Sequence, residues 1–170
     1  MKHLHEMLRA RELIPPLTIQ TPEGRTVRAW DFKQKKNLVI AFLDAGCEVC
    51  EEFLRALAQR SDDLGEKEAV VLAAFLEPVR FGLADGMPPE IILGADVSGR
   101  SIQRFLGDGA IASRSRGGRG VFVADRWGEL SACWIAQQHE FPSLGEILAN
   151  LEHIRIACEE CFMPEWPIEG

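Results

Sequence analysis

The sequence predicts an α/β domain in which a central mixed β-sheet is flanked by helices. Two uninterrupted apolar runs, residues 38–43 and 69–76, have the composition of strands that are buried on both faces. Between these runs, residues 47–59 place their apolar side chains at helical spacing. Strands that alternate with helices in this way form a largely parallel sheet covered on both faces.

The N-terminal part of the chain predicts a hairpin in front of this sheet. Residues 4–12 have the composition of a short polar helix, which the prolines at 15 and 16 end. Residues 17–20 and 26–28 alternate apolar and polar side chains on either side of Pro22, Glu23 and Gly24. This pattern is typical of two strands joined by a tight turn, so we expect an N-terminal β-hairpin extension.

The middle of the chain is less regular. Residues 90–93 predict a third, shorter strand, and the Gly- and Pro-interrupted connection over residues 78–89 predicts no helix. A short helix around residues 102–106 follows Asp96 and Ser98, which are candidate caps.

The last third of the chain predicts a second hairpin and a closing helix. Residues 111–120 are rich in Ser, Arg and Gly and predict a loop. Two strands, over residues 121–124 and 130–136, follow with a short turn between them. Ser143 and Glu146 form a capping-box pattern, which opens an amphipathic helix.

Length and charge limit the domain count and the partners. A chain of 170 residues with 46% hydrophobic residues suits a single domain, with a core over about residues 13–157 and an irregular tail over 158–170. The net charge of −7 argues against a nucleic-acid-binding face. The longest apolar run falls far short of the ~18 residues that span a bilayer, and the first residues lack a signal peptide's apolar core. We therefore expect a cytoplasmic protein with no membrane partner.

Five cysteines carry the strongest functional signal, and four of them form two Cys-x-x-Cys pairs. The pairs are Cys47 with Cys50 and Cys158 with Cys161. A disulfide framework is not expected in a reducing compartment, so this spacing indicates redox chemistry or a metal site. The fifth, Cys133, lies in a predicted strand and is expected to pack as a small hydrophobe.

The first pair falls at a predicted strand-to-helix turn, which favours redox chemistry over metal binding. The exposed N–H groups and the dipole at a helix N-terminus stabilise a thiolate. Cys47 is then the exposed attacking thiol, and Cys50 lies one turn further on as the resolving thiol. Three glutamates in the first helical turn, at positions 48, 51 and 52, oppose further negative charge on sulfur.

The second pair follows the closing helix and leaves three alternatives. A helix over residues 143–157 spans about 22 Å, which places Cys158 and Cys161 at the opposite end from the first pair. They are an auxiliary dithiol that reaches the first pair of a neighbouring subunit, half of a zinc site completed by another subunit, or a structural pair. No organic cofactor is expected, and zinc is the one metal candidate.

Several segments together resemble a known family. Leu17-Thr18-Ile19 with the following turn, Leu38-Val39-Ile40-Ala41-Phe42 before Cys47-Glu48-Val49-Cys50, and Arg119-Gly120-Val121-Phe122 occur in a specific order and spacing. From about residue 13 to 157 they resemble the thioredoxin-like superfamily, in its redoxin or peroxiredoxin-like (AhpC/TSA) branch. The resemblance implies a thioredoxin-like fold and redox activity.

The sequence departs from both branches of that superfamily. Thioredoxins carry a cis-proline before the strand that faces the cysteine pair, and by spacing Arg119 occupies that place here. Peroxiredoxins often have arginine followed by glycine there, where the arginine helps to hold the peroxide. Their Pro-x-x-x-Thr-x-x-Cys motif is absent in the register of either Cys47 or Cys50. The chain thus combines a thioredoxin-type cysteine pair with a peroxiredoxin-type arginine. The resemblance implies Cys47, Cys50 and Arg119 as site residues.

Three functions follow from these features. The leading hypothesis is a thiol–disulfide oxidoreductase, in which Cys47 attacks a protein disulfide, Cys50 resolves the mixed disulfide and Arg119 shapes the facing loop. The alternative is a peroxiredoxin-like thiol peroxidase acting on a peroxide. Either enzyme needs a thiol electron carrier for recycling, and a second copy of the chain is a candidate partner. The third hypothesis is a non-catalytic module that binds zinc or a protein through its cysteines.

Overall fold

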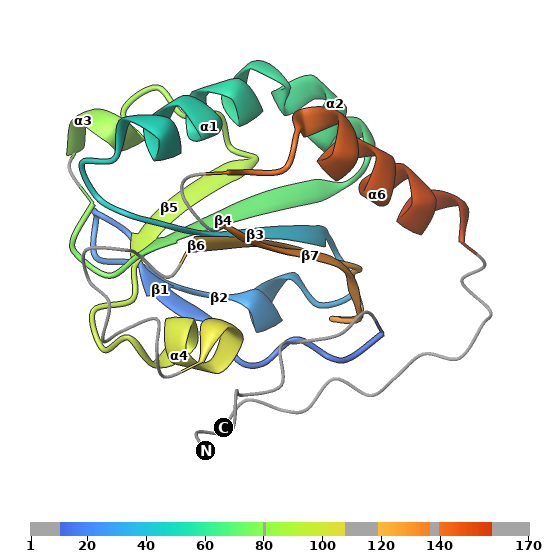
Figure 1. Cartoon of the computed structure of the whole chain (residues 1–170), viewed down its shortest axis with the longest axis horizontal. Helices are drawn as coiled ribbons and strands as arrows, with labels where there is room; N and C mark the ends of the chain where they lie inside the picture. The colour runs from blue at the N-terminus through green and yellow to red at the C-terminus, as the bar shows by residue number, and fades with distance from the viewer. Residues whose placement is uncertain (1–10, 80, 108–118, 137–139, 158–170) are drawn as a thin grey trace.

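The protein is an α/β structure built on one seven-stranded sheet. The computed structural model describes residues 11–79, 81–107, 119–136 and 140–157. The strand order is β2-β1-β5-β4-β3-β6-β7, and helices lie on both faces of the sheet (Figure 1). The mixed sheet with flanking helices that the sequence predicts is therefore confirmed.

The centre of the sheet consists of the two apolar runs. β3 (Asn37–Leu43) pairs in parallel with β4 (Ala69–Phe75) along its whole length, and β4 pairs in parallel with β5 (Ile91–Ala95). Every residue of β3 and β4 is buried. Helices cover both faces of these strands, which is why their sequences are continuously apolar instead of alternating.

Antiparallel strands form both edges of the sheet. The expected hairpin is present as β1 (Thr18–Gln20) and β2 (Thr26–Arg28). At the other edge, β6 (Arg119–Ala124) runs antiparallel to β3, and β7 (Leu130–Ala136) runs antiparallel to β6. The sequence predicted an antiparallel pair at only one edge, and the structure adds the N-terminal hairpin at the other.

One face of the sheet is covered by the short helix α3 (Phe81–Ala84) and by longer helices, all drawn above the sheet in Figure 1. The longer helices are α1 (Glu48–Gln59), α2 (Ser61–Glu66) and α6 (Leu144–Ile156). α1 buries Phe53, Leu54 and Leu57 against the sheet, while α6 buries Ile147 and Leu151. The helical spacing of these side chains is the pattern by which the sequence predicted both helices.

The opposite face holds a second core built on aromatic side chains. The short helix α4 (Arg100–Leu106) and the 3-10 helix η1 (Ala29–Phe32) contribute to it. The rings of Phe42, Phe105 and Phe122 lie 5.0–5.9 Å apart, in tilted and edge-to-face arrangements. These contacts fix α4 against the two central strands β3 and β6.

The residues that the sequence predicted as caps bond to the first turns of α6 and α4. Ser143 Oγ accepts the N–H of Glu146 at 3.1 Å, and Glu146 Oε2 accepts the N–H of Ser143 at 2.8 Å. At α4, the Asp96 carboxylate accepts the N–H of Ile102 at 3.0 Å, and Ser98 Oγ accepts the N–H of Arg100. Ser143 is the N-cap of α6, as predicted, whereas the N-cap of α4 is Gly99, and Asp96 and Ser98 accept N–H groups of the first turn from positions just before it.

Two segments differ from the sequence prediction. Residues 78–89 contain a four-residue helix, α3 (Phe81–Ala84), because a single helical turn is too short to leave a periodic pattern. Arg119 and Gly120 belong to strand β6 instead of a loop, since Gly120 pairs with Phe42 of β3. The expected helix over residues 4–12 and the loop before Arg119 lie almost entirely outside the described residues.

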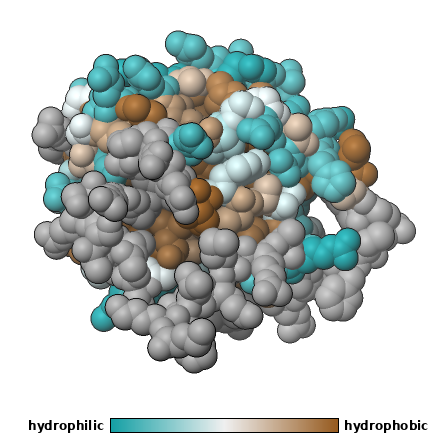
Figure 2. All heavy atoms as spheres, viewed as in Figure 1, coloured by the Kyte–Doolittle hydropathy of each residue, from teal (hydrophilic) through white to brown (hydrophobic). Residues whose placement is uncertain are grey.

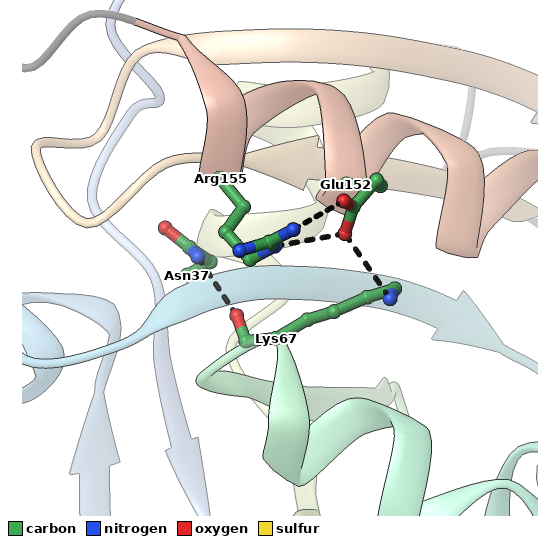
Figure 3. A network of polar contacts seen from close by, with 4 residues as sticks. All are labelled: Asn37, Lys67, Glu152 and Arg155. Atoms are coloured by element: carbon green, nitrogen blue, oxygen red, sulfur yellow. Dashed lines mark hydrogen bonds and ion pairs between the residues drawn. The ribbon is translucent and has the colours of Figure 1, made fainter.

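A polar network closes the edge of the sheet at which β3 and β4 begin (Figure 3). Lys67 Nζ lies 3.4 Å from Glu152 Oε2, and the Arg155 guanidinium lies 2.6 Å from Glu152 Oε1. Asn37 Nδ2 donates to the Lys67 carbonyl at 3.0 Å. The hydrogen bond from Arg155 is the main reason that the pKa of Glu152 falls to about 2. This network fixes the C-terminal end of α6 near the start of β3.

The outer surface of the helical layer is polar. Figure 2 shows mostly hydrophilic surface along the top of the molecule, and apolar surface lower down in the same view. In the part of the chain that the structure describes, no helix is both long and apolar enough to cross a membrane.

Candidate functional site

The first cysteine pair lies where the chain leaves the central strand β3 and enters α1. β3 ends at Leu43 and α1 begins at Glu48, with a short turn between them. Gly46 in this turn has a φ of 72°, in the left-handed region that favours glycine. We call residues 44–47 the redox turn. It places Cys47 at the N-cap position of α1.

Cys47 and Cys50 differ in exposure and are linked by a hydrogen bond. The N–H of Cys50 donates to Cys47 Sγ at 3.3 Å. Cys47 is partly exposed, whereas Cys50 is completely buried in the core beneath α1. A donated hydrogen bond and the positive end of a helix both stabilise negative charge on the Cys47 sulfur. The site therefore combines an accessible sulfur with a second thiol one helical turn behind it.

Charged and apolar side chains surround this accessible sulfur. Glu48 and Glu51 lie in the first turn of α1, and Glu51 Oε2 forms an ion pair with Arg55 at 3.2 Å. That pairing offsets part of the negative charge which the sequence places near Cys47. Val49, between the two cysteines, is 39% exposed and adds apolar surface beside them.

Arg119 lies at the same edge of the sheet as the redox turn. It is the first residue of β6, and its neighbour Gly120 pairs with Phe42, one residue before the end of β3. A Cβ at Gly120 would lie 2.9 Å from Leu106 Cδ2, so glycine allows the end of α4 to approach β6. The backbone of Arg119 is thus brought to the end of β3 from which the redox turn starts.

A pocket of about 630 Å³ opens beside the redox turn, between α1 and the segment after β4. It begins at Ala45 and Gly46, directly before Cys47, and follows the outer flank of α1. We call it the α1–α3 pocket, and it is lined by Ala45, Gly46, Glu51, Arg55, Ala58, Gln59, Phe75, Val79, Gly82, Leu83, Asp85, Gly86 and Met87.

This pocket was not predicted from the sequence, although one signal was present. Val79, Leu83 and Met87 recur every four residues, which is the spacing of one helical face. Only Leu83 of the three lies in α3, and Gly82 and Gly86 between them obscured that spacing. All three side chains pack against the core beneath α1.

Cys133 lies apart from the first pair. It is a half-buried thiol on β7 and packs against the core on the α4 face of the sheet. Burial raises the pKa of its thiol, which disfavours the reactive thiolate. This placement agrees with the expected role as a small packing side chain.

The second pair, Cys158 and Cys161, lies outside the described residues, but the helix that leads to it is described. Phe141, before α6, stacks on Phe53 of α1 at 4.6 Å, while Glu152 near its other end contacts Lys67. α6 therefore runs from the redox edge to the opposite edge, over about 20 Å. The four residues from Ala157 to Cys161 span at most about 14 Å when extended. The second pair thus follows a helix that ends far from Cys47.

The described residues offer no further metal ligands beside Cys47 and Cys50. Within them, no group of three or more His, Cys, Asp and Glu side chains lies close enough to hold a metal ion. Cys47 and Cys50 offer two sulfur ligands, whereas structural zinc takes four ligands. The zinc candidate at Cys158 and Cys161 lies beyond the described part of the chain.

The sheet order, the flanking helices and a cysteine pair at the start of α1 define the class of fold, which is thioredoxin-like. No family model matches the sequence, and no curated protein matches it. Solved structures match it clearly, and peroxiredoxins are among them.

Three of these structures show the extent of the similarity. The mitochondrial 2-Cys peroxiredoxin of Plasmodium falciparum matches with a TM-score of 0.69 at 16% identity, over 86% of this chain and 94% of that one. The reduced 2-Cys peroxiredoxin of Plasmodium vivax gives 0.70 at 15% identity, over 92% and 90%. Peroxidoxin BcpB of Mycobacterium tuberculosis gives 0.69 at 17% identity, over 87% and 99%. The chain therefore has the thioredoxin-like fold in its peroxiredoxin-like form.

Proposed function

We propose that this protein is a thiol peroxidase of the peroxiredoxin type, with Cys47 as the residue that reacts with peroxide. The observation that carries the proposal is the geometry of the pair. Cys47 Sγ is accessible, sits at the N-cap of α1 and accepts the N–H of Cys50, while the buried Cys50 thiol lies one turn behind. The similarity of the fold to 2-Cys peroxiredoxins supports a peroxide as the substrate.

The reaction uses two electrons in two steps. The Cys47 thiolate attacks one peroxide oxygen, the O–O bond breaks, and the other oxygen leaves as water or an alcohol after taking up a proton. This leaves a sulfenic acid on Cys47. The Cys50 thiol then attacks the Cys47 sulfur, water leaves, and a Cys47–Cys50 disulfide forms. Cys50 is buried, but its partner in this second step is the neighbouring Cys47 and not a molecule from solvent.

Arg119 and a thiol carrier complete the proposed cycle. Arg119 lies at the edge of the sheet where the redox turn begins, and we assign it the role of holding the peroxide and offsetting the charge of its leaving oxygen. A cytoplasmic dithiol carrier would return two electrons to the disulfide by thiol–disulfide exchange.

A thiol–disulfide oxidoreductase is the second candidate function. The Cys-x-x-Cys spacing favours it, because the same pair can attack a protein disulfide through Cys47 and resolve the mixed disulfide through Cys50. The two functions differ in the oxidant that reacts with Cys47. Peroxide oxidises it in the first function, and a disulfide oxidises it in the second.

Thiol counting after oxidation tests the proposal. The wild type, Cys47→Ser, Cys50→Ser and the control Cys133→Ser are each treated with one equivalent of hydrogen peroxide and mapped by mass spectrometry. We expect the wild type and the control to lose two thiols as a Cys47–Cys50 disulfide. Cys50→Ser should stop at a sulfenic acid on Cys47, and the thiols left in Cys47→Ser should react no faster than simple free cysteine.

Two results would contradict the peroxidase. A Cys47–Cys50 disulfide that forms quickly with oxidised glutathione but only slowly with peroxide would favour the oxidoreductase. If neither oxidant reacts faster at Cys47 than at a simple free cysteine, the fold is a non-catalytic module. Metal content measured on the same sample then tests zinc binding through Cys158 and Cys161.

A further inference from the structure

The α1–α3 pocket has the length and volume of a site for a short helix. It follows α1 from the redox turn to Gln59, and the 12 residues of α1 span about 18 Å. A helix of ten residues is about 15 Å long, so it fits along this flank. Amphipathic helices are commonly recognised in this way, with their apolar face laid into an apolar depression between two elements of the partner.

The inner wall of the pocket is apolar. Phe75 and Val79 are 1% and 9% exposed and belong to the core beneath α1. Leu83 and Met87 are partly buried and pack against the same core. Apolar surface that covers this wall is removed from water, which favours binding.

The rim of the pocket is open and carries more negative than positive charge. A Cβ built at Gly82 or Gly86 meets no atom within 4 Å, so the α3 side leaves room above the wall. Among the described residues that line the pocket, Arg55 pairs with Glu51 at 3.2 Å, and Asp85 adds a second carboxylate that is exposed. The rim therefore favours an occupant with an excess of positive charge.

The N-terminal segment of this chain, residues 1–10, has the apolar pattern that fits such a wall. The segment lies outside the described residues, but its sequence shows the spacing of one helical face. At helical spacing, four large apolar side chains fall within an arc of about 120°. They are Met1, Leu4, Met7 and Leu8.

The charge of this segment also complements the pocket. Its basic residues, Lys2 and Arg9, outnumber its one acidic residue, Glu6. The protein as a whole has a net charge of −7, so a segment with an excess of basic residues is unusual in this chain. Long basic side chains can reach a carboxylate on the rim, such as that of Asp85, while the apolar face of the segment covers the wall.

Within one chain, the segment starts from the wrong side of the sheet to reach this pocket. The N–H of Arg11 donates to the Leu130 carbonyl at the start of the edge strand β7, and Ile14 belongs to the core on the α4 face. The pocket wall belongs to the core on the opposite face. Figure 1 shows α1 and α3 on one side of the sheet and α4 on the other. A second copy can present its segment without passing around the sheet.

We infer that the α1–α3 pocket docks the N-terminal segment, residues 1–10, of a second copy of this chain. The apolar face of the segment covers the wall, and its basic side chains lie at the acidic rim. Because each copy carries one pocket and one segment, two copies can exchange their segments and close a dimer. The docking involves no reaction at Cys47, so the inference is independent of the proposed function.

A synthetic peptide of residues 1–10, labelled with fluorescein, tests the pocket by fluorescence anisotropy. The binding partner is the full chain with Leu4→Ser and Leu8→Ser, whose own segment no longer competes. We expect saturable binding, which Gly82→Leu should weaken about tenfold or more, because its side chain covers the wall. Gly145→Leu, at an exposed position on α6, is the matched control and should bind as its parent does. Ala58→Leu fills the pocket from α1 if Gly82→Leu does not fold.

Two further variants test the chemistry of the contact. A peptide with Leu4→Ser and Leu8→Ser should not bind, because it lacks the apolar face. Asp85→Lys in the full chain should weaken binding of the unmodified peptide several-fold at low salt, and the difference should shrink at high salt, because added ions screen the charges.

Sedimentation velocity tests whether the occupant is a second copy. The wild type should associate as its concentration rises, whereas Gly82→Leu alone and the Leu4→Ser/Leu8→Ser variant alone should remain monomeric. A mixture of these two variants should associate again, since one supplies an intact segment and the other an intact pocket. Gly145→Leu should associate like the wild type.

Three results would overturn the inference. A peptide that does not bind, or that binds equally to the parent, Gly82→Leu and Ala58→Leu, would show that the pocket is not its site. A wild type that stays monomeric far above the peptide's Kd would show that the segment docks within its own chain. Association that persists unchanged in both single variants would assign the dimer to another surface. None of these results depends on whether Cys47 reacts with peroxide.

Discussion

Asp125, at the turn between β6 and β7, shows how a single residue can link stability to pH. Its Oδ1 accepts the N–H of Trp127 at 2.8 Å and the N–H of Glu129 at 2.9 Å. Burial raises the pKa of this carboxyl above its usual value, although the hydrogen bonds oppose the rise. The folded state therefore binds a proton more readily than the unfolded chain. The contribution of Asp125 to stability falls as the pH rises through that range.

The Asp125→Asn variant should become more stable, relative to the wild type, as the pH rises. The amide keeps an oxygen that can accept both N–H groups but removes the charge whose burial is costly. We expect the melting temperature of the variant, minus that of the wild type, to be larger at pH 7 than near pH 3, where the wild-type carboxyl is protonated. Asp125→Ala is the control, since it loses both hydrogen bonds and should be less stable at either pH, by about 1–3 kcal/mol. An equal difference for Asp125→Asn at both pH values would contradict the assigned cause.

At the scale of elements, Gly94 controls how the N-terminal hairpin joins the sheet. β1 meets β5 through the pairing of Gln20 with Ala95. A Cβ at Gly94 would lie 2.9 Å from the Gln20 carbonyl oxygen and 2.9 Å from Ile19 Cβ. The close approach of these two strands therefore depends on the absence of a side chain at Gly94.

Gly94→Ala should destabilise the protein by about 1–3 kcal/mol, because backbone as well as side-chain atoms must move to admit the methyl group. Gly145→Ala makes the same chemical change in α6, where the new Cβ would make only an ordinary contact with Ser143 Oγ, at 3.8 Å. This control should stabilise the protein by up to about 1 kcal/mol through helix propensity. Urea unfolding of both variants measures the two effects. Similar signs for the two substitutions would show that crowding at Gly94 is relieved elsewhere.

The elements that the sequence predicted well are those with local causes. The capping box at Ser143 and the apolar face of α1 are encoded within a few residues, so they could be read directly. The start of β6 at Arg119 depends instead on pairing with β3, almost eighty residues earlier in the chain. A Gly- and Arg-rich segment carries no local signal of such a partner, and the sequence therefore predicted a loop there.

At the scale of the whole molecule, the network around Glu152 connects α6, α2 and the start of the sheet. The hydrogen bond from Arg155 lowers the pKa of Glu152 from 4.5 to about 2, with help from Lys67. Because the folded pKa is lowered, this contribution to stability is present above pH 4.5 and is lost as the pH falls towards 2. The Glu152 and Arg155 side chains are exposed, so the effect on stability should be small and sensitive to salt.

Glu152→Gln should therefore be less stable than the wild type at pH 7 and equally stable near pH 2. Guanidinium unfolding would itself screen the charges, so urea at low salt is the appropriate measurement. Arg155→Gln should lose the same pH dependence, since it removes the partner with the largest effect. A difference between Glu152→Gln and the wild type that persists at pH 2 would assign the stabilisation to packing instead of charge.

As with the fold, one part of the candidate site could be predicted from the sequence and another part could not. The position of the Cys47–Cys50 pair could be predicted, because a Cys-x-x-Cys motif between a strand and a helix is visible within twenty residues. The α1–α3 pocket could not, since its walls come from the redox turn, α1, the end of β4 and residues 79–87. These segments meet only after β4 has paired with β3. The role of Arg119 in holding a peroxide stays a prediction, because the strand pairing places only its backbone near the end of β3.

The hydrogen bond from Cys50 to Cys47 Sγ has a spectroscopic consequence. Most amide protons in a helix point to a carbonyl oxygen, but the amide proton of Cys50 points to the sulfur of Cys47. Oxidation of that sulfur changes the acceptor's charge and polarisability, and formation of a disulfide with Cys50 removes the arrangement altogether. In ¹⁵N-labelled protein, the ¹H–¹⁵N resonance of Cys50 should therefore report each redox state, without a probe attached to either thiol.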